Sequence, residues 1–281
     1  MEPTSLSRRL LWWVTRRKGA LQMAGLRLAR AYVHAVRDYS YNCDLNGEAW
    51  LLQQLSGLQV GIVFDVGANV GDWARLARRS MPLASIHAFE LSDSIRSTLR
   101  ERVSDLRVEV AEAALADHDG DVQYKDFGGC SGLNTIVTAT THHDWRSPTV
   151  KHARVMRGDA YCRAAGVDRI DLLKVDVEGF EGAVLQGFGE MLSPDHVRCI
   201  QFEYGYGNGD THWLMKDFAH FLAQRGYVVG KLWHDGVAFT PFEYSWNDFE
   251  SGPNYVAVGR EDFGLQRLVA RSAPQSGRRD S

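Results

Sequence analysis

Two short motifs of this 281-residue sequence hold the acidic residues and glycines best suited to chemistry. "DVGANVG" runs from Asp65 to Gly71, between an apolar stretch and a helical pattern. In open α/β sheets ligands bind beyond the carboxyl ends of the strands, and glycines there allow a close approach to the backbone. Gly67 permits a tight turn, and Gly71 permits close contact between the helix and the strand. We therefore expect Asp65, Gly67, Asn69 and Gly71 to surround a bound cofactor.

The order of residues in this motif narrows the choice of cofactor. A nicotinamide fingerprint reads G-x-G-x-x-G and a P-loop ends in G-K-[ST], and this motif follows neither pattern. The charge of Asp65 would repel a pyrophosphate at the first glycine, and it suits a cationic group. Glu90 follows the next predicted strand, where a carboxylate can accept hydrogen bonds from both hydroxyls of a ribose. The two carboxylates fit S-adenosylmethionine, a nucleoside that carries an amino acid and a sulfonium.

The second motif, "KVDVEG", ends another predicted strand. Lys174, Asp176 and Glu178 alternate in it, so their side chains share one side of an extended segment. A buried parallel strand rarely carries three charges without cause. We expect Asp176 to lie beside the transferred methyl group and either to position an acceptor hydroxyl or to act as its base. For Lys174 and Glu178 two interpretations are open, a catalytic role or a structural ion pair with a helix cap.

Glu203 and His143 are further candidates for the acceptor side of the site. Glu203 ends the following predicted strand in "QFEYG", where it could bind substrate hydroxyls or a nearby loop. Asp176 and Glu203 could together hold a divalent cation, but we expect no metal requirement. His143 lies in the irregular stretch 127–152, where a histidine is more often exposed and idle. It could serve as the base if that loop closes over the site.

Apolar strands and amphipathic helices alternate after residue 57, and this alternation positions both motifs at strand ends. It predicts an open, mostly parallel sheet with helices on both faces. Strands are expected at 60–66, 85–89, 107–110, 122–124, 171–177, 197–204, 227–232 and 255–258. Helices are expected at 70–80, 93–103, 159–165, 182–192 and 212–225. The aromatic stretch 234–254 is expected to be a loop.

The chain divides into a basic amphipathic helical extension at 1–57, a main domain at 58–262 and a disordered tail at 263–281. Residues 1–40 hold eight basic and two acidic residues, so they carry +6 while the whole chain carries −3. The extension either packs on the main domain or contacts anionic lipid or a lipid-linked substrate, which leaves peripheral membrane contact through residues 6–40 open. A homodimer through the same segment is a further alternative.

The composition excludes several classes of protein. With 44% hydrophobic residues and a net charge of −3, the chain is an ordinary globular protein, and we expect no nucleic-acid partner. Its four cysteines form no C-x-x-C pair, which favours reduced thiols and a cytoplasmic location, with contact at the inner membrane face as the alternative. No apolar run approaches the ~20 residues of a spanning helix.

Five motifs in order, "DVGANVGDW", "HAFEL", "AEAALAD", "LLKVDVEGFEGAVLQGF" and "CIQFEYG", resemble the FkbM-type S-adenosylmethionine-dependent methyltransferases. The resemblance covers residues 60–260, and K-x-D-x-E-G at 174–179 is its most specific part. It implies a Rossmann-like α/β fold, the seven-stranded class I methyltransferase sheet. It also implies methylation, mostly of hydroxyls on sugars or natural products, and places Ala113 on the cofactor side.

These observations predict O-methylation of a hydroxyl on a sugar, glycolipid or glycosylated natural product, with a small-molecule or glycan acceptor. One alternative is N-methylation of an amide or amine, which needs no base and leaves Asp176 only a positioning role. An alternative of another class is a scaffold that binds the cofactor without catalysis.

Overall fold

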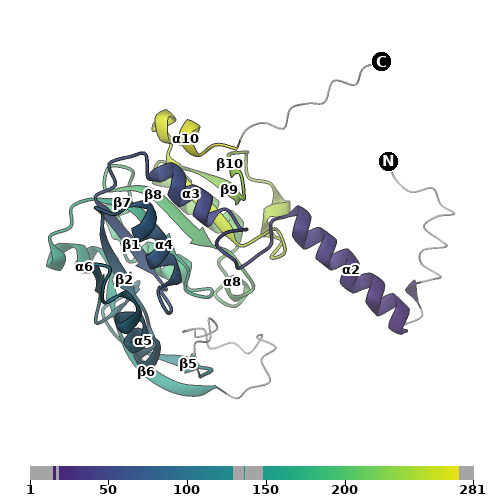
Figure 1. Cartoon of the computed structure of the whole chain (residues 1–281), viewed down its shortest axis with the longest axis horizontal. Helices are drawn as coiled ribbons and strands as arrows, with labels where there is room; N and C mark the ends of the chain where they lie inside the picture. Colours follow the sequence, from purple (N-terminus) through teal and green to yellow (C-terminus); the bar gives the residue numbers. More distant parts are fainter. Residues whose placement is uncertain (1–14, 17–18, 129–135, 137–147, 272–281) are drawn as a thin grey trace.

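The computed structural model of the chain describes residues 15–16, 19–128, 136 and 148–271. Its centre is an eight-stranded sheet of order β10-β9-β11-β8-β7-β1-β2-β3 (Figure 1). Five strands are parallel: β1 (Ile62–Val66), β2 (Ser85–Phe89), β3 (Val108–Val110), β7 (Ile170–Val175) and β8 (Val197–Glu203). The sheet is extended by β11 (Asn254–Gly259), antiparallel to β8 and β9 (Tyr227–Trp233), and by β10 (Gly236–Ala238), antiparallel to β9.

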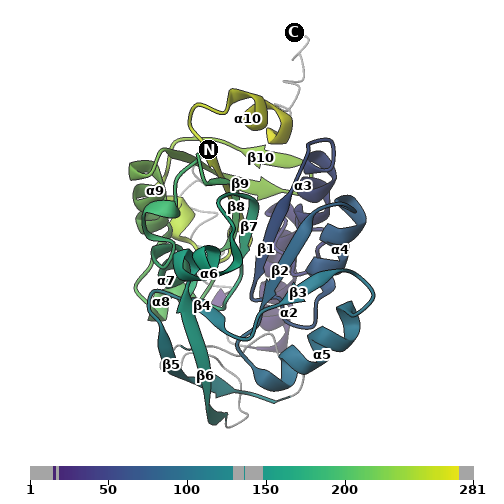
Figure 2. The ribbon, with the colours of Figure 1, turned by 90° about the vertical axis from the view of Figure 1, so that its left-hand side faces the viewer.

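Helices cover both faces of this sheet (Figure 2). One face packs against α3 (Glu48–Leu55), α4 (Asp72–Ser80), α5 (Asp93–Val103) and α10 (Phe263–Val269), and the other against α6 (Gly158–Ala165), α7 (Glu181–Gln186) and α9 (Met215–Gln224). Side chains alternate along a strand, so Val63 of β1 joins the first core and Phe64 joins the second. The apolar character of β1 therefore follows from burial on both faces.

A second, three-stranded sheet lies beside the first. In it, β6 (Thr149–Arg157) pairs parallel with β4 (Ala114–Ala116) and antiparallel with β5 (Gly120–Asp126). The short α8 (Gly207–Asp210) follows β8, and 3-10 turns occupy Gly189–Met191 and Tyr244–Asn247.

The predicted α/β fold with helices on both faces is confirmed, but two strands lie where loops were expected. β10 falls in 234–254 and gives the main sheet eight strands instead of seven, and β6 begins inside 127–152. Both have weak patterns, because β10 has three residues and the first four residues of β6 are exposed. Pairing with a partner strand, which a sequence window does not contain, supplies their hydrogen bonds.

The two ends of the main domain extend beyond the expected boundaries. Leu51, Leu52 and Leu55 of α3 are buried in the core, so the expected extension 1–57 contains part of the globular body. Residues 263–269 form α10 instead of the expected disordered tail, because Leu265 and Val269 are spaced to bury one helical face. The remainder of that tail, 272–281, lies outside the described residues.

Helix α2 (Ala20–Val36) is the expected amphipathic segment, and none of its residues is buried. It projects away from the body in Figure 1. Among the helices of the described residues, none combines the length and the apolarity that crossing a bilayer requires.

Candidate active site

A pocket of about 220 Å³ opens at the carboxyl ends of β1, β2 and β7. Its walls come from the loop after β1, the end of β2, the loop after β7 and the segment between α2 and α3. Of the residues expected to bind cofactor, Gly67, Asn69 and Glu90 line it, and of those expected to be catalytic, Lys174 and Asp176 do. The pocket is therefore at the edge of the sheet where the sequence motifs predicted a site.

At Gly67 a neighbouring segment of backbone leaves no room for a side chain. Its φ is +81°, and a Cβ added there would overlap the carbonyl oxygen of Asp176. Gly71, with φ +88°, would bring a Cβ within 2.7 Å of Leu99 Cδ1 and 2.9 Å of Val103 Cγ1. Both of these neighbours belong to α5, so the close contact expected at Gly71 is between helices and not with the strand. Gly71 stands behind the pocket wall.

A buried ion pair connects β1 with β7. Asp65 is fully buried, and its Oδ1 lies 3.2 Å from Lys174 Nζ, which also lies 3.2 Å from Asp176 Oδ2. Burial raises the pKa of the Asp65 carboxyl in spite of the ammonium. Burial opposes the charge of Lys174, but Asp176 and Asp65 outweigh it and raise the pKa of Lys174. Asp65 is not among the described residues that line the pocket, and it contacts the pocket residue Lys174 through the ion pair.

Glu90 joins the β1 loop to the end of β2. Its Oε2 accepts a hydrogen bond from the Asn69 backbone N–H at 3.0 Å, and its Oε1 accepts one from the Ser92 backbone N–H at 2.9 Å. Burial raises the pKa of Glu90 despite these donors. A carboxylate has about four acceptor positions, so two remain available toward the pocket. Nearby, Ala114 and Leu115 line the pocket, while the expected Ala113 is buried beside them.

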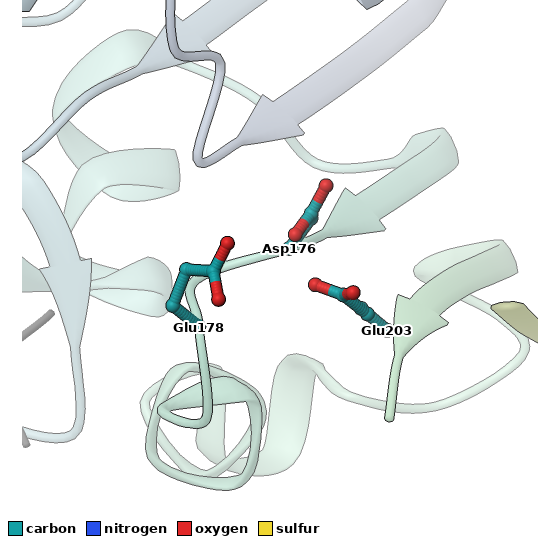
Figure 3. A group of neighbouring side chains, drawn as sticks. All are labelled: Asp176, Glu178 and Glu203. Carbon is teal, nitrogen blue, oxygen red and sulfur yellow. The ribbon is translucent and has the colours of Figure 1, made fainter. Parts of the chain in front are cut away.

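Three carboxylates meet beside the pocket. Asp176, Glu178 and Glu203 each offer an oxygen within 4.8 Å of the others, and Figure 3 shows them converging from two neighbouring strand ends. Burial and the charge of Asp176 raise the pKa values of Glu178 and Glu203 well above the ordinary range. Asp176 is 37% exposed, toward the pocket. The partial burial of Asp176 acts to raise its pKa. The charge of Lys174 and a hydrogen bond with Glu203 have the larger effect, so the pKa of Asp176 is lowered.

The loop after β7 is shaped by glycines and by a buried acid that the sequence analysis did not single out. Gly179 has φ +100°, and a Cβ on it would overlap the backbone of Gly207. The Glu181 carboxylate accepts hydrogen bonds from the N–H groups of Val177 (2.9 Å) and Gly179 (3.1 Å) and from Asn208 Nδ2 (2.6 Å). Burial raises the pKa of Glu181 to about 7. This network holds the loop that carries the acidic side chains.

The pocket also contains residues that the sequence motifs did not indicate. Tyr41, Cys43 and Glu48 come from outside the expected main domain, and Trp73 follows the glycine motif. The buried indole Nε1 of Trp73 has no hydrogen-bond partner among the described residues. A buried donor without a partner beside an ammonium and several carboxylates can bind a polar group of a ligand. His143 lies outside the described residues.

The chain matches the family model described as the methyltransferase FkbM domain over residues 65–229. Two relatives are the 2-O-methyltransferase NoeI of Sinorhizobium fredii and the hexuronic acid methyltransferase AglP of Haloferax volcanii. NoeI is 27% identical over 154 residues, which cover 51% of this chain and 63% of NoeI. AglP is 22% identical over 243 residues, which cover 81% of this chain and 97% of AglP. The chain thus spans less than two thirds of NoeI.

A crystal structure of a methyltransferase FkbM from Methylobacillus flagellatus is also similar, at 14% identity and a TM-score of 0.44. The match covers 71% of this chain and 44% of that chain. The methyl donor of the family is S-adenosylmethionine, the cofactor that the sequence predicted. The family model covers more than half of the chain, from the glycine motif of β1 into β9. The chain belongs to the FkbM methyltransferase family.

Proposed function

We propose that this protein methylates a hydroxyl of a sugar, a glycolipid or a glycosylated natural product. The observation that carries the proposal is the position of Asp176. It reaches into the pocket beside Gly67, it is paired with Lys174, and it belongs to a cluster of three carboxylates. The names of NoeI and AglP, a 2-O-methyltransferase and a hexuronic acid methyltransferase, support a sugar hydroxyl as the acceptor.

The cofactor side of the pocket would be formed by the β1 loop and Glu90. The free acceptor positions of Glu90 suit the two ribose hydroxyls, and Gly67 and Asn69 line the wall next to it. Lys174 and the Trp73 N–H, which has no partner in the described part of the chain, suit the carboxylate of the methionine end. When bound there, S-adenosylmethionine supplies a methyl group that its sulfonium has already activated. In this proposal Asp65 acts through Lys174.

The acceptor side would be formed by the acidic cluster. An alcohol is a weak nucleophile, so its proton must leave as the new O–C bond forms. Lys174 keeps Asp176 ionised, which makes Asp176 the acceptor of the hydrogen bond from the hydroxyl and fixes the direction of attack. The hydroxyl proton passes to the Asp176 carboxylate as the new O–C bond forms, and the carboxyls of Glu178 and Glu203 lie beside it in the cluster. Glu178 lines the pocket, and Glu203 lies behind Asp176.

A labelled methyl donor with a panel of glycans and glycolipids tests this function. We expect S-adenosylhomocysteine release and a labelled methyl ether on one acceptor class, identified by mass spectrometry. Methylation of amines alone would replace the proposal by N-methylation. Cofactor binding without release for any acceptor would favour the scaffold.

A further inference from the structure

Helix α2 presents an apolar face that no part of the described chain covers. Leu21, Leu28 and Tyr32 are 81%, 74% and 70% exposed. At 3.6 residues per turn these three side chains lie within about 40° of one another around the helix axis. The alanines at positions 24 and 35 fall beside them, so the face is apolar along most of the helix. A water-exposed face of this size marks an interaction surface.

The cations of α2 lie on its opposite side, beside the half-exposed Met23 and Leu26. Arg27 and Arg30 lie there, Arg37 ends the helix in an ion pair with Asp248, and helix α2 contains no acidic residue. Residues 1–40 carry a net charge of +6. The whole chain carries −3, so residues 41–281 carry −9. An anionic surface would therefore attract the N-terminal segment and repel the body. Two copies of this segment would repel each other, which disfavours a second copy as the occupant.

The base of α2 is fixed next to the pocket. Arg37 Nη1 donates a hydrogen bond to Asp248 Oδ2 at 2.6 Å, and Asp38 accepts one from His234 Nδ1 at 2.7 Å. Tyr41, three residues further on, lines the pocket. The C-terminal end of the apolar face, at Tyr32, is consequently the end nearer to the pocket.

We propose that α2 lies in the interface of an anionic lipid bilayer, with its apolar face among the acyl chains and with Arg27 and Arg30 at the headgroups. Helices that combine such a face with several cationic residues bind in the plane of the interface. The attachment does not depend on the proposed function. One consequence rests on that function, because a lipid-linked acceptor would be presented at the bilayer surface beside the pocket.

Flotation with vesicles tests the proposal on the full-length protein. We expect binding to vesicles of phosphatidylcholine with phosphatidylglycerol and much weaker binding to pure phosphatidylcholine. The double variant Leu21→Gln, Leu28→Gln should lose at least about tenfold in vesicle affinity, since leucine side chains would leave the apolar region. Arg27→Gln and Arg30→Gln should each lose roughly fivefold, an effect that high salt removes.

Leu83→Gln is the matched control, because Leu83 is 93% exposed on another part of the surface and should not affect vesicle binding. S-adenosylhomocysteine affinity, measured on the same samples, should not change in any variant and separates this proposal from the proposed function. With a glycan that the wild type methylates, the double leucine variant should lose methyl transfer to the lipid-linked form of that glycan and keep methyl transfer to the free form. Absence of binding to anionic vesicles, or full binding by the double variant, would overturn the proposal. The proposal would also be overturned if the wild-type protein formed a concentration-dependent dimer that the double variant alone failed to form.

Discussion

Lys174 Nζ lies 3.2 Å from Asp176 Oδ2, and the same nitrogen lies 3.2 Å from the fully buried Asp65 Oδ1. One ammonium therefore bridges a buried carboxylate of β1 and a carboxylate that lines the pocket. Its removal should affect folding as well as turnover.

The buried pair can be tested by neutralising each partner. Lys174→Met should lower the free energy of unfolding by about 3–5 kcal/mol, because it leaves Asp65 buried without a counter-charge. The double variant Lys174→Met, Asp65→Asn should recover most of that loss, as measured by urea denaturation. If the double variant is no more stable than Lys174→Met alone, the ion pair does not explain the effect.

Replacement of Asp176 tests its place in the reaction. Asp176→Asn should leave S-adenosylhomocysteine affinity nearly unchanged and reduce kcat about 10²-fold or more, because the amide cannot hold or receive the hydroxyl proton. Asp195→Asn, at an exposed position, is the control and should keep wild-type turnover. Wild-type kcat in Asp176→Asn would remove this residue from the mechanism.

Two glycines with nearly the same backbone angle distinguish crowding from conformational strain. Gly67 has φ +81° and would place a Cβ on the Asp176 carbonyl, whereas Gly128 has φ +78° and open space around it. Gly128→Ala should cost about 1–2 kcal/mol of stability, the ordinary cost of this conformation. Gly67→Ala should cost clearly more and weaken S-adenosylhomocysteine binding. Equal melting temperatures for the two variants would contradict the crowding.

The buried Lys231 should make stability depend on pH. Burial lowers its pKa to about 7, and the side chain donates hydrogen bonds to the carbonyls of Leu232 and Asn254. Between this value and the unfolded pKa of about 10.4, the unfolded chain binds more protons, so stability rises as the pH rises. The free energy of unfolding should increase from pH 7 to pH 9, and less so in Lys231→Met. The exposed Lys216→Met should follow the wild type.

Metal removal tests the acidic cluster. Asp176, Glu178 and Glu203 have oxygen atoms close enough to hold a cation, and oxygen ligands suit magnesium or calcium. We expect methyl transfer to survive exhaustive treatment with EDTA, because Lys174 already balances Asp176. Activity that disappears and returns on adding one divalent metal would establish a metal enzyme instead.

The sequence predicted the parts of the fold that local pattern determines. β2 and α5 have the expected bounds, Ser85–Phe89 and Asp93–Val103, because their apolar residues repeat over the whole element. β10 and β6 depend on partner strands, and α10 is a short apolar repeat in an otherwise polar terminus.

The candidate site was predictable to a similar degree. Asp176 and Glu203 end neighbouring parallel strands, and such ends must meet at one edge. The neighbour of Gly67 was not predictable, because a glycine indicates a close approach without indicating what approaches. Glu181 reads as an ordinary helical acid until its three donors are seen.

The contact between Gly67 and the Asp176 carbonyl also limits how relatives of this protein can diverge. The loop after β1 and the segment that carries Asp176 share one backbone contact, so neither can shift without displacing the other. New acceptors must therefore be accommodated away from this contact, in the segment after α2 that brings Tyr41 and Cys43 to the pocket and can change in length. Engineering of acceptor choice should begin with exchange of that segment.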